Sequence, residues 1–260
     1  MLELNKEFRY CLVENRLEGF FSNVMVILDA LNSMKIKGAS VKNICILWNN
    51  NLYQNNTENL CDKYLFKNLF NETNLTSIKA LDFYSRPGFF INANYRNQIN
   101  DILFEIQYYK NLYYKKFFSE SIVQNSSVLG VQIRRTDHSM HGKLLDLEEI
   151  IKLIEIELLN FDYENIFIAT DDVRCLSELI SIYKDRIIFN QGIARSISEI
   201  AIHRANYENK EKLAQDVLLD AISLSKCKKL LITSSNVSHF AVCLNKELNY
   251  EYMDYKIDYK

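Results

Sequence analysis

The chain has 260 residues, a formal net charge of -2 and 48% hydrophobic residues. A chain of this length can bury a sizeable core, in one large or two small domains. The nearly neutral charge argues against a general nucleic-acid binder, because such a protein needs a basic face. No apolar run reaches the roughly 18 residues of a membrane-spanning helix. The N-terminal sequence MLELNKEFRY contains acidic residues and no apolar segment, so we expect no secretory signal.

The cysteines favour a reducing compartment. None of the six belongs to a CxxC pair, and several lie in apolar stretches. We therefore interpret them as reduced core residues of a cytoplasmic protein. Asn, Lys, Ile and Tyr are abundant, which is typical of an AT-rich bacterial gene. Peripheral attachment to a membrane and the oligomeric state stay open.

Apolar patterns predict strands and helices in the N-terminal half. They are, in chain order, a strand at 9–14, a helix at 24–34, a strand at 43–48, a helix at 60–70, a strand at 77–84 and a long helix at 98–118. The polar stretch 120–127 follows the long helix and is typical of a boundary between domains. We therefore expect an N-terminal α/β domain at 1–122 and a second domain at 123–260.

The loop between the first strand and the first helix contains Gly19, and Asn23 is the predicted N-cap of that helix. Such a loop can bind an anion, because the free N–H groups and the dipole of the helix point towards it. The segment has neither a GxGxxG nor a Walker pattern. An ordinary strand-to-helix turn therefore stays open as the alternative to a binding loop.

The C-terminal half alternates strands and helices regularly. The predicted strands are 128–133, 165–170, 186–189 and 230–233, and the predicted helices are 146–159, 173–183, 199–206, 211–226 and 238–244. This alternation predicts a parallel sheet with right-handed crossovers. The carboxyl ends of parallel strands share one edge, where ligands bind in open α/β sheets.

Polar residues follow the predicted strands at that edge. Arg134 and Arg135 end the first strand, Asp171 and Asp172 end the second, and the turn 234–238 ends the last. A guanidinium offers a planar fork of donors that suits phosphate. The arginines therefore indicate a phosphate-bearing ligand, and a surface salt-bridge cluster is the alternative.

The three groups together favour a nucleotide-diphosphate-sugar site. An arginine pair can hold a diphosphate and stabilise it as it leaves. A carboxylate can accept hydrogen bonds from a base or a ribose, and a helix N-terminus adds donors for phosphate oxygens. No DxD motif stands at a strand end, so we expect neither a metal ion nor another cofactor.

Three blocks make the sequence resemble the GDP-fucose-dependent fucosyltransferases of the α1,6 and nodulation type and related bacterial polysaccharide enzymes. They are GVQIRRTD at 130–137, IATDD at 168–172 and LLDAISLSKCKKLLITSSNVSHFA at 218–241. The resemblance implies an α/β, GT-B-like fold, in which two Rossmann-like halves with parallel sheets face a cleft. It also implies that the C-terminal half binds the GDP-sugar and that the N-terminal half lies on the acceptor side.

The resemblance further implies roles for single residues. Arg134 and Arg135 would bind the diphosphate, with Arg135 closest to the departing charge, and Asp137 would hold the loop. Asp171 or Asp172 would contact the guanine or the ribose. The other donor-binding candidates are Gly19, Asn23, His203, Asp220, Ser234, Ser235 and Asn236.

The chain departs from the family pattern at two positions. Gln132 replaces the usual first histidine of the arginine motif, and Gly142 stands where the eukaryotic α1,6 enzymes have a glutamate. An inverting transfer needs a base for the proton of the acceptor hydroxyl. His138 and His141 are the nearest candidates, with an unperturbed pKa of about 6.5, and Asp137 is a third. Exposed loop histidines without a role are the alternative.

We therefore expect an inverting, metal-independent glycosyltransferase that moves fucose from GDP-fucose to a glycan acceptor in bacterial surface polysaccharide synthesis. Two alternatives stay open. One is a transferase for another GDP-sugar, such as a GDP-heptose, because the arginines recognise the diphosphate and not the sugar. The other is a non-catalytic relative that binds a nucleotide-sugar or a glycan, because the histidine and the glutamate of the family are missing.

Overall fold

The computed structural model describes residues 9–14, 19–36, 38, 41, 44–49, 59–66, 91–124, 127–136, 145–202, 204 and 209–253. The chain forms two compact units, Met1–Lys116 and Phe117–Lys260. The expected domain boundary, after residue 122, lies just beyond this division, and the roles assigned to the two halves stay predictions. No helix in the described ranges is long and apolar enough to cross a membrane.

The N-terminal unit contains two parallel strands, β1 (Arg9–Glu14) and β2 (Ile44–Asn49), which pair along their whole length. Helix α1 (Phe20–Ile36) lies between them in sequence and is buried over most of its surface. It begins earlier than expected, because Phe20 and Phe21 are also buried. Asn23 therefore lies inside the first turn, and its prediction as an N-cap was wrong.

The predicted long helix at 98–118 is broken. The structure has α2 (Ala93–Glu105), the 3-10 helix η4 (Tyr108–Lys110) and α3 (Leu112–Glu120). The helix ends because Gln107 adopts a left-handed conformation with φ of 58°. Asn111 then accepts a hydrogen bond from the N–H of Tyr113 at 2.8 Å. Tyr109 and Tyr113 keep the helical spacing across this break, so the periodicity of the sequence does not reveal it.

Two other expected elements are only partly described. The predicted helix at 60–70 is seen at 60–66, where its main part is the π-helix η2 (Asp62–Phe66). The predicted strand at 77–84 lies outside the described residues.

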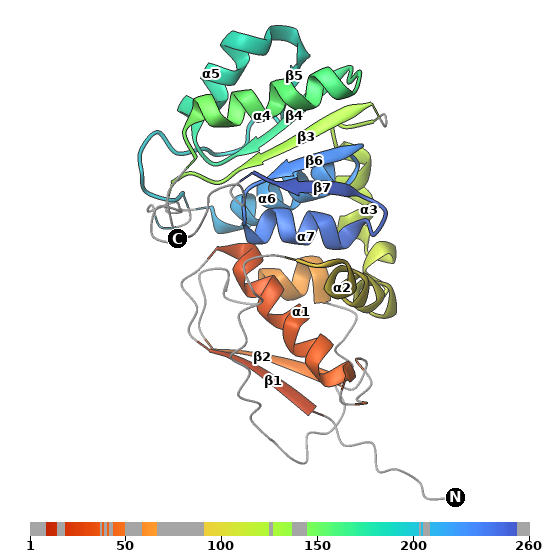
Figure 1. Ribbon diagram of the computed structural model, residues 1–260. Coiled ribbons are helices and arrows are strands. Elements are labelled where there is room, and N and C mark those ends of the chain that lie inside the picture. The colour runs from red at the N-terminus through yellow and green to blue at the C-terminus, as the bar shows by residue number, and fades with distance from the viewer. Residues whose placement is uncertain are drawn as a thin grey trace, which may run out of the picture. The chain divides into compact units, whose positions relative to one another are not determined.

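The C-terminal unit is built on a five-stranded sheet of parallel strands in the order β5-β4-β3-β6-β7. The strands are β3 (Val128–Ile133), β4 (Asn165–Thr170), β5 (Ile187–Ile188), β6 (Lys229–Ile232) and β7 (Asn249–Tyr252). The helices are α4 (Leu147–Asn160), α5 (Val173–Tyr183), the 3-10 helix η6 (Lys184–Arg186), α6 (Lys210–Ser225) and α7 (Asn236–Leu244). Figure 1 shows α4 and α5 on one side of this sheet and α6 and α7 on the other. This is a doubly wound arrangement, with the parallel sheet expected from the alternation of the elements and the Rossmann-like form implied by the family resemblance.

The structure differs from the expected elements of this unit chiefly at two places, besides η6, which takes Arg186 from the predicted strand 186–189. Strand β7 was not predicted, because its residues NYEY are polar and only half-buried at the edge of the sheet. The predicted helix at 199–206 was wrong for residues 199–202, which form bends and a turn. The serine hydroxyls of Ser196 and Ser198 bond to each other and to backbone groups there, and so compete with a helix.

The central strand β3 is buried along its whole length. Leu129, Val131 and Ile133 pack in the core that also contains residues of α4 and α5. On the other face, a Cβ at Gly130 would lie 2.3 Å from Leu230 Cδ2 and 2.9 Å from Cys227 Sγ. Glycine is therefore the residue that lets β6 and the end of α6 pack closely on β3.

Candidate functional site

The carboxyl ends of β3 and β6 meet at the point where the strand order reverses. The chain runs outwards from β3 through β4 to β5 on one side, and through β6 to β7 on the other. Gln132 of β3 pairs with Ile232 of β6, so Arg134 and Thr233 emerge side by side. In doubly wound sheets this switch point is where ligands bind.

Thr233 joins the two strand ends. Its side-chain oxygen accepts a hydrogen bond from the backbone N–H of Arg134 at 2.9 Å, and its hydroxyl donates to Gln132 Oε1 at 3.0 Å. The N–H of Thr233 also donates to the carbonyl of Gln132 at 3.0 Å. Gln132, which replaces the expected histidine, is thus a buried residue of β3 whose amide oxygen orients Thr233.

Asp171, which follows β4, contacts three consecutive residues after β3. Its Oδ1 accepts a hydrogen bond from the backbone N–H of Arg135 at 2.9 Å. Its Oδ2 accepts from the hydroxyl of Thr136 at 2.5 Å and lies 2.7 Å from Nη1 of Arg134. One carboxylate therefore holds both the backbone and a side chain of the arginine segment.

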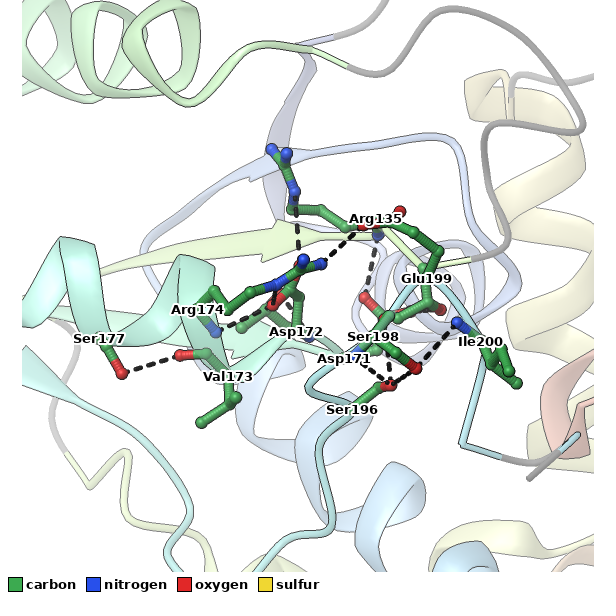
Figure 2. A network of polar contacts seen from close by, with 12 residues as sticks. Arg135, Asp171, Asp172, Val173, Arg174, Ser177, Ser196, Ser198, Glu199 and Ile200 are labelled. Atoms are coloured by element: carbon green, nitrogen blue, oxygen red, sulfur yellow. Dashed lines mark hydrogen bonds and ion pairs between the residues drawn. The ribbon is translucent and has the colours of Figure 1, made fainter. Parts of the chain in front are cut away.

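Asp172 lies inside the protein and is the N-cap of α5. It accepts hydrogen bonds from Nε of Arg174 at 3.0 Å and from Nη2 at 2.7 Å, and Nε of Arg135 lies 3.8 Å away. Burial alone would raise the pKa of Asp172, but the hydrogen bonds and charge of Arg174 hold the pKa below its usual value. Arg174 also bonds to Glu199 at 2.9 Å, so a chain of alternating charges runs from Arg135 to Glu199 (Figure 2).

The segment after β5 is attached to the same edge through Ser196. The N–H of Ser196 donates to the carbonyl of Asp171 at 2.7 Å, and the N–H of Val173 donates to the carbonyl of Ser196 at 3.0 Å. Beyond this attachment, the side chains of Ile197 and Ile200 are 79% and 59% exposed. The segment therefore presents two apolar side chains beside the charged cluster.

The turn after β6 leads into the N-terminus of α7. Ser235 is the N-cap and accepts a hydrogen bond from the N–H of Ser238 at 3.3 Å, while the hydroxyl of Ser238 donates to the carbonyl of Thr233 at 2.8 Å. Ser234, Ser235 and Asn236 are half-buried. The positive end of the helix dipole thus lies at the switch point and favours an anion there.

Asp220 lies on α6, away from the surface. Its Oδ1 accepts a hydrogen bond from Nδ2 of Asn190 at 2.8 Å, and only 7% of the residue is exposed. Burial raises the pKa of Asp220 to about 7, although Asn190 and the charge of Arg195 act in the opposite direction. Arg195 donates to the carbonyl of Asn190 at 3.3 Å. In the structure Asp220 therefore holds the segment after β5 through its hydrogen bond to Asn190.

The structure brings some of the predicted site residues together at one edge of the sheet, whereas others lie in the N-terminal unit or outside the described residues. Arg134, Arg135, Asp171, Asp172 and the turn after β6 share one edge of the sheet. Gly19 and Asn23 belong to the N-terminal unit, where the Gly19 carbonyl accepts from Asn23 Nδ2 at 3.2 Å and Asn23 is buried. Four predicted residues lie outside the described part of the chain: Asp137, His138, His141 and His203.

Three residues that organise this edge were not singled out from the sequence, namely Thr136, Arg174 and Thr233. Each stands within three residues of a predicted strand-end charge or serine, so a search for every polar residue next to a strand end would have found them. In the described ranges, no three His, Cys, Asp or Glu side chains are grouped so that they could hold a metal ion.

No protein-family model and no curated protein matches the sequence. Solved structures match the fold. Fucosyltransferase NodZ from Bradyrhizobium is similar over 92% of this chain and 94% of its own, at 12% identity and a TM-score of 0.51. A NodZ alpha-1,6-fucosyltransferase crystal soaked with GDP-fucose is similar over 92% and 93%, at 12% identity and a TM-score of 0.50.

A POFUT1 structure in complex with GDP-fucose is similar over 95% of this chain and 74% of its own, at 10% identity. Its TM-score of 0.39 is too low to carry an argument about the fold. The NodZ structures reach the level at which a fold is shared, and they agree with the resemblance carried by the three sequence blocks. The chain thus has the α/β fold of the solved NodZ fucosyltransferases.

Proposed function

We propose that the protein is an inverting glycosyltransferase that moves fucose from GDP-fucose to a glycan acceptor. The observation that carries this proposal is the pair Arg134 and Arg135, which lies beside the N-terminus of α7 at the switch point of a Rossmann-like sheet. Cations and a helix N-terminus together suit a diphosphate. The shared fold with NodZ, one crystal of which was soaked with GDP-fucose, supports the choice of donor.

In this proposal the acceptor oxygen attacks the anomeric carbon of fucose from the side opposite GDP. The bond between that carbon and the β-phosphate oxygen breaks, and GDP leaves with the electron pair. Arg134 and Arg135 stabilise the charge that develops on the phosphate, so that the transfer needs no metal ion. Asp137, His138 or His141 takes the proton of the acceptor hydroxyl.

The proposal extends to the organisation of the chain. The C-terminal unit binds the donor and the N-terminal unit binds the acceptor, in a GT-B-like arrangement. The acceptor is a glycan of a bacterial surface polysaccharide. The segment after β5, with Ile197 and Ile200, forms one wall beside the nucleotide.

The first test is a thermal shift with GDP, UDP, ADP and CDP. We expect GDP to raise the melting temperature of the wild-type protein and to have no effect on the Arg135→Ala variant. Arg186→Ala is the matched control, because Arg186 bonds to the carbonyl of Tyr163 at the opposite edge of the sheet. Absence of a shift with every nucleotide would contradict the proposal.

The second test measures GDP release from GDP-fucose and from other GDP-sugars in the presence of polysaccharide acceptors. We expect GDP-fucose to be preferred, and EDTA to leave the rate unchanged. We expect His138→Ala or His141→Ala to lower turnover much more than donor affinity. Binding of GDP without any sugar transfer would instead identify a non-catalytic relative.

A further inference from the structure

Asp171 or Asp172 was expected to contact the guanine or the ribose, but the side chain of Asp171 bonds to the segment after β3. In the described part of the chain, its three side-chain partners lie on consecutive residues after β3: the Arg134 guanidinium, the Arg135 N–H and the Thr136 hydroxyl. The Asp171 side chain is 12% exposed. The segment that bears the proposed diphosphate ligands is thus held by a residue 35 to 37 positions further along the chain.

We infer that Asp171 is a positioning residue, which sets the two arginines for the diphosphate and does not itself contact the nucleoside. This inference rests on the proposed function and deepens it. It assigns the recognition of the base and the ribose to other residues.

The acceptor capacity of the carboxylate supports this inference. An ionised carboxylate has about four lone-pair positions. The Arg135 N–H uses one of them on Oδ1, and Thr136 and Arg134 use the two on Oδ2. Guanine presents two neighbouring N–H groups, and a ribose presents two neighbouring hydroxyls. Either pair needs two acceptor positions, whereas Asp171 has about one left.

The geometry also explains how Asp171 would act on a ligand that it does not touch. An arginine side chain loses much rotational freedom when it binds an anion, and prior fixation lowers that cost. Asp171 fixes Arg134 through its guanidinium, and it fixes Arg135 through the backbone N–H. The Arg135 guanidinium is then directed by the carbonyl of Leu145, at 3.1 Å, and by Asp172. Loss of the Asp171 carboxylate should therefore loosen both arginines together.

Isothermal titration with GDP, inorganic pyrophosphate and guanosine tests the inference on Asp171→Asn. The amide keeps one acceptor oxygen but cannot accept hydrogen bonds on its nitrogen, so it loses either the contact to the Arg135 N–H or the contacts to Thr136 and Arg134. We expect the affinities for GDP and pyrophosphate to fall by the same factor, on the order of tenfold, and the guanosine affinity to stay unchanged. A fall for GDP and guanosine with unchanged pyrophosphate binding would assign Asp171 to the nucleoside and overturn the inference.

A double-mutant cycle adds a second criterion. If Asp171 acts through Arg134, Asp171→Asn should have a much smaller effect on pyrophosphate affinity in the Arg134→Ala background than in the wild type. Equal effects in the two backgrounds would show that Asp171 does not act through Arg134. Thr136→Val removes one donor and keeps the carboxylate, so it should reproduce part of the loss even if Asp171→Asn folds poorly. The matched control is Asp185→Asn, at an exposed position in η6.

The same titrations separate this inference from the proposed function. If the wild-type protein binds neither GDP nor pyrophosphate, the proposed function fails and the inference fails with it. If the wild type binds both ligands and Asp171→Asn binds them equally well, only the positioning role is overturned.

Discussion

The side-chain oxygen of Thr233 accepts a hydrogen bond from the backbone N–H of Arg134 at 2.9 Å. Thr233 follows β6 and Arg134 follows β3, and the two residues are 99 positions apart in the sequence. The bond joins the strand ends on the two sides of the switch point. It therefore connects the arginine segment to the turn that leads into α7.

Replacement of Thr233 by valine should destabilise this junction. Valine has nearly the same shape, but it leaves the Arg134 N–H and Gln132 Oε1 without their hydroxyl partner. We expect the free energy of unfolding to fall by about 1–3 kcal/mol, the usual cost of an unsatisfied buried polar group. Urea denaturation measures it, and Thr233→Ser should restore most of the loss. Equal stability of the valine variant and the wild type would show that the bond is not formed.

Replacement of Gly130 by alanine should disturb the centre of the sheet. The new Cβ would lie 2.3 Å from Leu230 Cδ2, which is closer than atoms can approach. We expect a loss of about 1–3 kcal/mol, as for other overpacked cores. Leu230→Val should reduce this cost, so that the double variant is more stable than the sum of the single effects predicts. The denaturant midpoints of the wild type, the two single variants and the double variant test this expectation.

Asp220 should make the stability of the protein depend on pH. Burial raises its folded pKa to about 7, whereas the ordinary value is 3.8. The folded state therefore binds the proton more tightly than the unfolded state. The contribution of Asp220 to the free energy of unfolding is fully present below about pH 4 and declines as the pH rises towards 7. Asp220→Asn should remove this decline. The free energy of unfolding of the variant, relative to that of the wild type, should therefore be about 1–4 kcal/mol higher at pH 8 than at pH 4. Thermal melts of both proteins from pH 4 to 8 test the sign, and a gap that narrows as the pH rises would contradict it.

Glu157 should stabilise the amino edge of the sheet without affecting the candidate site. Its carboxylate is buried, lies 2.6 Å from Lys229 Nζ and accepts a hydrogen bond from Tyr163 at 2.7 Å. We expect Glu157→Leu to cost about 3–5 kcal/mol, because it leaves the ammonium group of Lys229 poorly paired. Glu157→Leu combined with Lys229→Met should recover much of that loss. Both variants should keep the GDP-induced thermal shift, measured for each against its own melting temperature without GDP.

Most elements of the C-terminal unit follow from local sequence patterns. The predicted strand 165–170 and helix 173–183 have the observed bounds of β4 and α5. The other helices end within two residues of the prediction, except in the segment 199–206. Such patterns are readable because a buried strand or one face of a helix must be apolar at a fixed period. Elements without that contrast were missed, such as the polar edge strand β7 and the break at Gln107.

Strand positions in the sequence also predict which residues reach the ligand-binding edge, because residues that follow parallel strands must emerge there. The pairing of these residues depends on the three-dimensional fold. Asp171 holds the arginine segment and Asp172 pairs with Arg174, although the two carboxylates are neighbours in the sequence. The direction of each side chain depends on strand register and on partners up to 101 residues away, and no local pattern encodes those distances.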